Sequence, residues 1–249
     1  MLRALYPISA LALFASLLGP TARAAEAMVM VNLNYSSEEL AAARAVAQKR
    51  GQEFVVVPPE ELIPLAEPLF KLRLKLEANV KRLRPDLNKS AISAIVNDFS
   101  RRGAASDKDP ALTNALRDDV EASYRATADL AKYEAKLGSM EAQIKAKAAA
   151  LRTRGVRVDS LIFSGHSDGA NLTGESTVRL SAGEIDRLRG QEPQLFNAPR
   201  HVLLLGCYNL TETNRERWRN DVFPNASLIA GFGVQAPSRW RENAIKYIP

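Results

Sequence analysis

The fold is decided by two apolar runs, Val158-Asp159-Ser160-Leu161-Ile162-Phe163-Ser164-Gly165, which leads into His166, and His201-Val202-Leu203-Leu204-Leu205-Gly206, which leads into Cys207. Short apolar runs bounded by turn residues are typical of buried strands in a parallel sheet. The carboxyl ends of neighbouring parallel strands lie side by side, about 4.8 Å apart, and ligands bind beyond them. We therefore expect His166 and Cys207 to face one shared site.

The segment before these runs predicts a βαβ unit. Residues 28–33 and 53–57 are strand-like, and residues 38–50 follow the capping residues Ser36 and Ser37 and end before Gly51. Strand, helix and strand with short connections indicate a parallel sheet. Residues 227–232 predict a last strand, and residues 213–221 predict a helix before it.

Residues 60–154 have a different pattern, rich in Ala, Leu, Lys, Arg and Glu with few β-branched runs. We expect helices over 67–83, 89–101 and 110–152, because apolar residues recur there at spacings of three and four. The chain is thus predicted to form an α/β domain over 25–249, with a mostly parallel sheet flanked by helices. The helical insertion lies between the second and third strands, where it could self-associate, cover the site or stabilise the domain.

The first 24 residues are typical of a secretory signal peptide. Arg3 precedes an apolar stretch over 8–18, and Ala22-Arg23-Ala24 supplies a small-residue cleavage site before Ala25. The apolar stretch is shorter than the roughly 20 residues of a membrane span. We expect an exported protein, periplasmic or extracellular, without stable membrane insertion after cleavage; an uncleaved anchor helix is the alternative.

Composition narrows the class of protein. The 34 Lys and Arg exceed the 28 Asp and Glu, for a formal net charge of +6, but the sequence has no basic stripe interleaved with aromatics. We therefore expect no nucleic-acid partner. Cys207 is the single cysteine, so it cannot form an internal disulfide. It is either a buried apolar side chain or a functional thiol, and its place at a strand end favours function.

The segment Gly165-His166-Ser167-Asp168-Gly169 has two interpretations. It matches G-x-S-x-G, the nucleophile elbow of serine hydrolases, with Ser167 as nucleophile. That elbow turns directly into a helix and needs a downstream histidine on a loop. Residues 170–177 favour a turn instead, and His201, the sole downstream histidine, begins a strand and is expected to be structural. A serine esterase therefore stays as the lesser alternative.

With His166 as the functional group, the chain resembles the caspase-like cysteine peptidases, which include caspases, metacaspases, gingipains, legumains and separases. The likeness covers 158–238. It rests on the runs into Ser164-Gly165-His166 and Gly206-Cys207 and on Leu180-Ser181-Ala182-Gly183-Glu184-Ile185 between them, which looks like the strand and helix start that these enzymes carry there. The resemblance implies a caspase-like sheet and hydrolysis of peptides or proteins. Cys207 and the two histidines form no metal-ligand spacing, and no Gly-rich phosphate loop precedes a helix, so we expect no metal and no cofactor.

The resemblance also implies roles for single residues. Cys207 would be the nucleophile and His166 its acid–base partner, with the backbone N–H groups of Ser167 and Cys207 as the oxyanion hole. The family usually has glycine where this chain has Ser167. The caspase motif Gln-Ala-Cys, with Gly two residues further on, is replaced here by Gly206-Cys207-Tyr208-Asn209, so aspartate specificity is not expected.

Substrate-binding candidates lie on either side of the predicted dyad. Asp168 could receive a basic side chain, although a turn role is the simpler interpretation. Ser238, Arg239 and Arg241 follow the last strand, where caspases carry a Ser-Trp-Arg stretch, with one arginine inserted here. A non-catalytic binding or scaffold domain of the same fold, with contacts made by the helices, is the remaining alternative.

Overall fold

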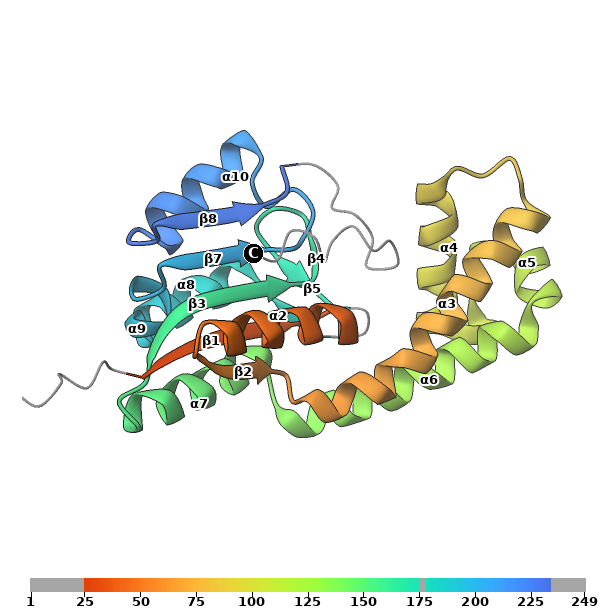
Figure 1. Cartoon of the computed structure of the whole chain (residues 1–249). Helices are drawn as coiled ribbons and strands as arrows, with labels where there is room; N and C mark the ends of the chain where they lie inside the picture. Colours follow the sequence, from red (N-terminus) through yellow and green to blue (C-terminus); the bar gives the residue numbers. More distant parts are fainter. Residues whose placement is uncertain (1–24, 175–177, 234–249) are drawn as a thin grey trace, which may run out of the picture.

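The core of the protein is a parallel sheet. The computed structural model describes residues 25–174 and 178–233. Within these ranges the strands of the main sheet lie in the order β2 (Glu53–Val57), β1 (Glu26–Asn32), β3 (Arg157–Ser164), β7 (His201–Leu204) and β8 (Leu228–Gly231) (Figure 1). Every neighbouring pair is parallel. The expected α/β class, the sheet flanked by helices and the insertion between the second and third strands are confirmed.

Helices cover both faces of the sheet. They are α2 (Ser37–Lys49) on one face and α7 (Met140–Thr153), α8 (Ala182–Gln191) and α9 (Pro193–Asn197) on the other. Strand β1 shows why two apolar layers form: Met28 and Met30 pack toward α2, whereas Ala27, Val29 and Val31 pack toward α7–α9. Side chains alternate between the faces of a strand, so a continuous apolar run suits a sheet buried on both sides.

The predicted βαβ unit forms close to its predicted bounds. The Ser36 hydroxyl caps α2 by accepting a hydrogen bond from the backbone N–H of Glu39, at 3.2 Å. Strand β7 is shorter than the apolar run suggested, because it ends at Leu204. The backbone N–H of Leu205 still donates to the carbonyl of Phe163, at 2.8 Å. The chain then leaves the sheet, so Cys207 lies in the loop beyond the strand.

The insertion forms an arm that extends from the sheet (Figure 1). Its elements are η1 (Glu60–Leu62), α3 (Ile63–Leu83), α4 (Lys89–Arg102), η2 (Gly103–Ala105), α5 (Pro110–Ala115) and α6 (Arg117–Leu137). The single helix expected over 110–152 is wrong, since it is interrupted at Leu116 and at Gly138. Gly138 has a left-handed φ of 77°, and Ser139 caps α7. The apolar periodicity continues across this interruption and conceals it.

The arm has its own apolar interior. Residues of α3, α4, α5 and α6 form a distal cluster that includes Leu76, Phe99 and Val120, separate from the clusters on the sheet. A smaller cluster near the sheet joins α3 and α6 to Tyr35, in the loop after β1. The buried Tyr35 hydroxyl donates to Oε1 of Glu134, at 2.6 Å, and burial followed by this carboxylate raises the pKa of Tyr35 well above its usual range. The arm is therefore anchored beside the end of β1.

Short elements complete the domain beyond β3. They are β4 (His166–Ser167), β5 (Leu172–Thr173) and β6 (Arg179–Leu180), which form an antiparallel sheet, and α10 (Glu212–Glu216) with the π-helical η3 (Arg217–Val222). The strand and helix start expected over 180–185 are present as β6 and α8. Ser181 and Glu184 form a capping box at the start of α8. The helix expected over 213–221 is present as α10 and η3.

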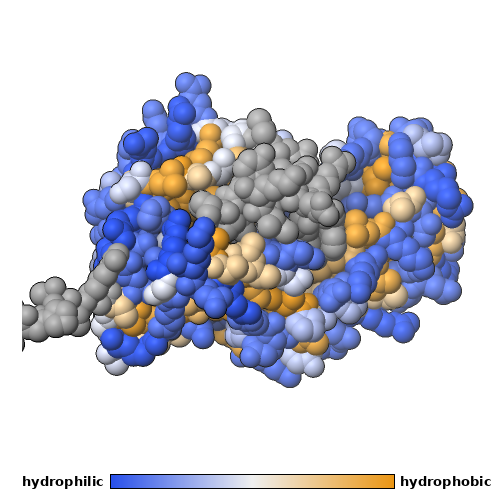
Figure 2. All heavy atoms as spheres, in the orientation of Figure 1, coloured by the Kyte–Doolittle hydropathy of each residue, from blue (hydrophilic) through white to orange (hydrophobic). Residues whose placement is uncertain are grey.

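The surface in the view of Figure 2 is mostly hydrophilic, with apolar residues in smaller patches. Across residues 25–174 and 178–233, no helix combines the length and apolar character of a membrane span. The expected signal peptide, residues 1–24, lies outside the described residues, as do Ser238, Arg239 and Arg241.

Candidate active site

The loops after β3 and β7 meet at the carboxyl edge of the sheet. The two strands are parallel neighbours, with Phe163 paired to Leu204. His166 follows β3 and is exposed, and Cys207 follows β7 and is partly buried. The two residues expected to share one site therefore leave neighbouring strands in the same direction (Figure 1).

Gly206 packs directly against the histidine loop. A Cβ added to Gly206 would lie 2.7 Å from Cβ of Ser167 and 2.9 Å from the carbonyl oxygen of Gly165. The residues that flank His166 on both sides thus contact the residue before Cys207. Tyr208 then adopts a left-handed φ of 55°, which turns the chain sharply after Cys207.

A hydrogen bond joins the side chains of the two loops. The Ser167 hydroxyl donates to Oδ1 of Asn209, at 2.7 Å, and accepts from the backbone N–H of Gly169, at 2.8 Å. Asn209 is fully buried. Ser167 therefore directs its proton to an amide oxygen, which is not a base that could activate a nucleophilic serine.

The rest of the serine-hydrolase arrangement is also missing at Ser167. The chain continues from Ser167 through the β4–β5 hairpin and not into a helix, as expected from the turn-forming residues 170–177, of which 170–174 are described. His201 lies at the amino end of β7, which is the opposite edge of the sheet, with Nδ1 3.3 Å from Oδ2 of Asp159. The position of His201 thus supports a structural role for it, and His201 cannot serve as a base for Ser167.

Two further contacts, from η3 and α10, each support one of the loops. The indole N–H of the buried Trp218 donates to the carbonyl of Gly169, at 3.1 Å, and Nδ2 of Asn214 donates to the carbonyl of Tyr208, at 3.0 Å. Sequence reasoning did not identify Asn209, Asn214 or Trp218. No local sequence pattern indicates these three residues. Each forms a hydrogen bond with a residue that the fold brings close, either from elsewhere in the chain or across a turn.

Asp168 is exposed in the loop directly after His166. Its carboxylate accepts hydrogen bonds from the backbone N–H groups of Asn171 and Ala170, at 2.8 and 3.0 Å, and from Nδ2 of Asn171, at 2.9 Å. The bonds from Asn171 lower the pKa of Asp168. Asp168 therefore performs the expected turn role and also places a negative charge beside His166.

Buried polar residues support the start of the histidine loop. Ser164 donates to the carboxylate of Glu39, which is 3% exposed, and accepts from Nδ2 of Asn34, at 3.1 Å. Nδ2 of Asn32 donates to the carbonyl of Ser36, at 3.2 Å, and thereby fixes the loop after β1. This cluster ties the ends of β1 and β3 to α2 next to Gly165 and His166, and sequence reasoning did not identify it.

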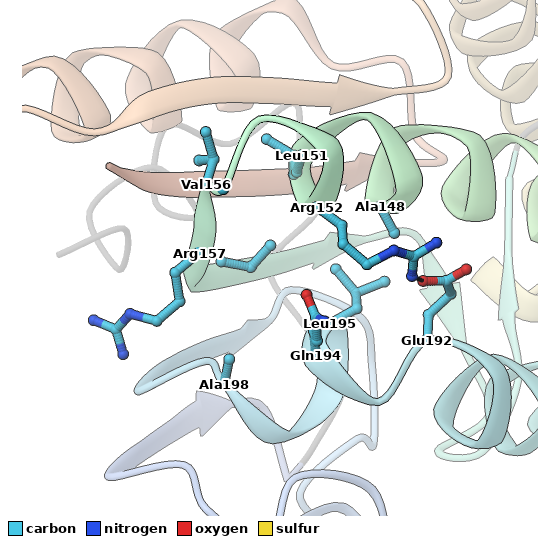
Figure 3. Close-up of a pocket in the computed structure, with 11 residues that line it drawn as sticks. Ala148, Leu151, Arg152, Val156, Arg157, Glu192, Gln194, Leu195 and Ala198 are labelled. Atoms are coloured by element: carbon cyan, nitrogen blue, oxygen red, sulfur yellow. Dashed lines mark hydrogen bonds and ion pairs between the residues drawn. The ribbon is translucent and has the colours of Figure 1, made fainter. Parts of the chain in front are cut away.

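A cavity of about 450 Å³ lies elsewhere, near the amino ends of the strands (Figure 3). It lies between α7, the turn into β3 and α9, and Arg152 at its side pairs with Glu192, at 2.6 Å. Arg157 points away from it (Figure 3). The cavity is on the edge of the sheet opposite His166 and Cys207, so it does not belong to the candidate site. In the described ranges no three His, Cys, Asp or Glu side chains are grouped so that they could hold a metal ion.

Comparison with known proteins assigns no family. No family model matches the chain, and neither a curated protein nor a solved structure matches it. The functional argument therefore rests on the residues and contacts described above.

Proposed function

We propose that this chain is an exported cysteine endopeptidase with Cys207 and His166 as its catalytic dyad. The observation that supports this most directly is the contact between the loops after β3 and β7, which lie on neighbouring parallel strands. A thiol and an imidazole at one strand edge are the groups that nucleophilic acyl transfer requires. Export relies on residues 1–24 and is checked by N-terminal sequencing of the exported protein, which should begin at Ala25.

In the proposed acylation step, His166 takes the proton of the Cys207 thiol. The thiolate forms a C–S bond to the scissile carbonyl carbon, and the carbonyl electron pair moves to oxygen. When the C–O double bond re-forms, the C–N bond breaks and the leaving amine takes the proton from His166. The product is a thioester between Cys207 and the amino-terminal part of the substrate.

In the proposed deacylation step, His166 accepts a proton from water as the water oxygen attacks the thioester carbon. The C–S bond then breaks, which releases a carboxylic acid and returns the thiol with the proton from His166. Backbone N–H groups of Ser167 and Cys207 would stabilise the oxyanion in both steps, each contributing about 3 kcal/mol. The exposed, charged Asp168 beside His166 supports a preference for a substrate with a basic side chain.

The proposal is tested by assaying the purified protein on a mixed library of quenched fluorescent peptides. Cys207→Ala and His166→Ala should each lower the rate at least about 10³-fold, because removal of either member stops the covalent step. His201→Ala is the matched control, since it removes the other histidine at the opposite edge of the sheet and should retain activity. Iodoacetamide should inactivate the wild-type protein.

Other outcomes would point to the alternatives. A folded wild-type protein that cleaves no peptide in the library would contradict the proposal and favour a non-catalytic binding or scaffold domain. Inactivation of ester hydrolysis by a serine-directed phosphonate, together with resistance to iodoacetamide, would favour an esterase that uses Ser167. Circular dichroism on each variant separates loss of activity from loss of folding.

A further inference from the structure

We infer that Asn209 is a positioning residue, which holds the Cys207 loop to the His166 loop through its hydrogen bond with Ser167. The inference rests on the proposed function, because it concerns the alignment of the dyad. Ser167 directly follows His166, and Asn209 is two residues beyond Cys207. The two side chains are 42 residues apart in sequence and joined at 2.7 Å.

The bond pairs the Ser167 hydroxyl as donor with the Asn209 amide oxygen as acceptor. The Ser167 hydroxyl has a single proton, which goes to Oδ1 of Asn209, and its oxygen also accepts the N–H of Gly169. Asn209 has 0% of its surface exposed, so water does not compete for Oδ1. Nδ2 of Asn209 has no hydrogen-bond partner in the part of the chain that is described. The fold thus uses the amide oxygen of Asn209, and this hydrogen bond restricts both loops.

Gly206 completes the arrangement by leaving space. A Cβ at Gly206 would lie 2.7 Å from Nδ2 of Asn209 and 2.7 Å from Cβ of Ser167. The side chains of Ser167 and Asn209 therefore meet over a position that has no side chain. A glycine at position 167, as the caspase-like peptidases usually have, could not make this bond. The bond between Ser167 and Asn209 therefore requires the serine that this chain has directly after His166.

The contacts that α10 and η3 make with these loops differ in kind. Asn214 and Trp218 donate to backbone carbonyls of Tyr208 and Gly169, so neither contacts the Ser167 side chain. The bond between Ser167 and Asn209 instead joins a side chain next to His166 to one in the Cys207 turn. Asn209 thereby ties Ser167, whose backbone N–H is a proposed oxyanion donor, to the Cys207 turn. Such donors lose effect when they move by about 0.5 Å.

A double-mutant cycle tests the inference in the purified protein. Ser167→Ala and Asn209→Ala should each lower kcat about tenfold with KM unchanged, as expected for loss of one aligned hydrogen bond. The double variant should be no slower than either single variant, because both substitutions remove the same bond. Two effects that multiply to about a hundredfold would overturn the inference.

Asn214→Ala provides the matched control. It removes an asparagine of α10 that donates to the carbonyl of Tyr208 and not to the Ser167 hydroxyl, so its effect should multiply with that of Ser167→Ala. If Ser167→Ala unfolds the protein in urea titrations, Ser167→Gly takes its place in the cycle, since glycine also lacks the hydroxyl. Coupling of Asn214 to Ser167 as strong as that of Asn209 would overturn the inference.

The same double-mutant cycle can be measured without a substrate, from the rate constant for alkylation of Cys207 by iodoacetamide. The rate constant at neutral pH should fall several-fold in both single variants and no further in the double variant, because the loops position the thiol beside His166. If the wild-type protein cleaves no peptide, the proposed function fails, and the alkylation cycle alone decides whether Asn209 positions the thiol. Additive changes in the alkylation rate would overturn the inference.

Discussion

Gly206 lies where the Cys207 loop crosses the His166 loop, and a methyl group has no space there. An added Cβ would contact Ser167, Asn209 and the carbonyl oxygen of Gly165 at 2.7 to 2.9 Å. One of these neighbours is backbone at the end of β3, which cannot move without disturbing the sheet. The residue before Cys207 is therefore restricted by its neighbours across the site and not by its own backbone angles.

Gly206→Ala should lower the free energy of unfolding by about 2 kcal/mol, because overpacking displaces backbone on both loops. Gly190→Ala in α8 is the control, since a Cβ there meets no atom within 4 Å. The control should be neutral or should stabilise the helix by about 0.5–1 kcal/mol. Urea denaturation measures both changes, and equal stability of Gly206→Ala and the wild type would contradict this packing argument.

At the scale of elements, the amino ends of β1, β3 and β7 are joined around Asp159. This side chain on β3 is 1% exposed and accepts from Nε2 of Gln52, at 2.7 Å, and from Nε of Arg200, at 2.5 Å. Arg157 lies 3.5 Å from it and also pairs with Glu26 on β1. Burial raises the pKa of Asp159, but the bonds from Arg200 and Gln52 and the nearby charges outweigh burial, so the pKa lies below its ordinary value.

This lowered pKa predicts an acid-sensitive contribution to stability. In the unfolded chain the pKa of an aspartate is about 3.9, whereas folded Asp159 keeps its charge to lower pH. Its stabilisation is therefore complete above pH 4 and is lost as the pH falls through the folded pKa. Asp159→Asn should lower the free energy of unfolding by about 2 kcal/mol at pH 7 and by less at pH 2–3.

Urea titrations between pH 2 and pH 7 measure this difference. Asp186→Asn is the control, because Asp186 pairs with Arg217 but its side chain is 51% exposed. Exposed pairs contribute about 0–1 kcal/mol, so this variant should show little pH dependence relative to the wild type. A constant difference between wild type and Asp159→Asn across the range would contradict the assignment of acid sensitivity to Asp159.

At the scale of the whole molecule, the sheet and the arm have separate apolar interiors. Phe99 is fully buried in the distal cluster of the arm, whereas Phe196 is buried against the sheet and stacks on Phe223, with ring centroids 5.5 Å apart. The two phenylalanines therefore belong to separate clusters, which are formed by different helices. Local stability is therefore expected to differ between the arm and the sheet.

Phe99→Ala should increase amide hydrogen exchange in α4 and α5 while β1 and β3 stay protected. Loss of a buried phenylalanine costs about 3–5 kcal/mol, which is enough to open a small helical cluster. Phe196→Ala removes the same side chain from the sheet domain and should increase exchange across β3 and β7. Equal exchange in the arm and the sheet for Phe99→Ala would show that the two interiors unfold as one unit.

The sequence alone determined the elements of the sheet and the edge at which His166 and Cys207 leave it. Continuous apolar runs and the Ser36 and Ser181 caps are local signals, and parallel pairing places the ends of neighbouring strands together. The break at Gly138 was also encoded locally, but a continuous apolar period concealed it. Local preferences act over a few residues, so they predict elements well.

Only the tertiary structure decided which side chains meet around those ends. The bond between Ser167 and Asn209, the space at Gly206 and the support of Ser164 by Glu39 each join residues distant in sequence. Nothing in the local pattern of either partner indicates the other, because such contacts depend on how the strands and helices pack. Sequence periodicity specifies which face of an element is buried, whereas hydrogen bonds of a few ångströms depend on positions that packing alone sets.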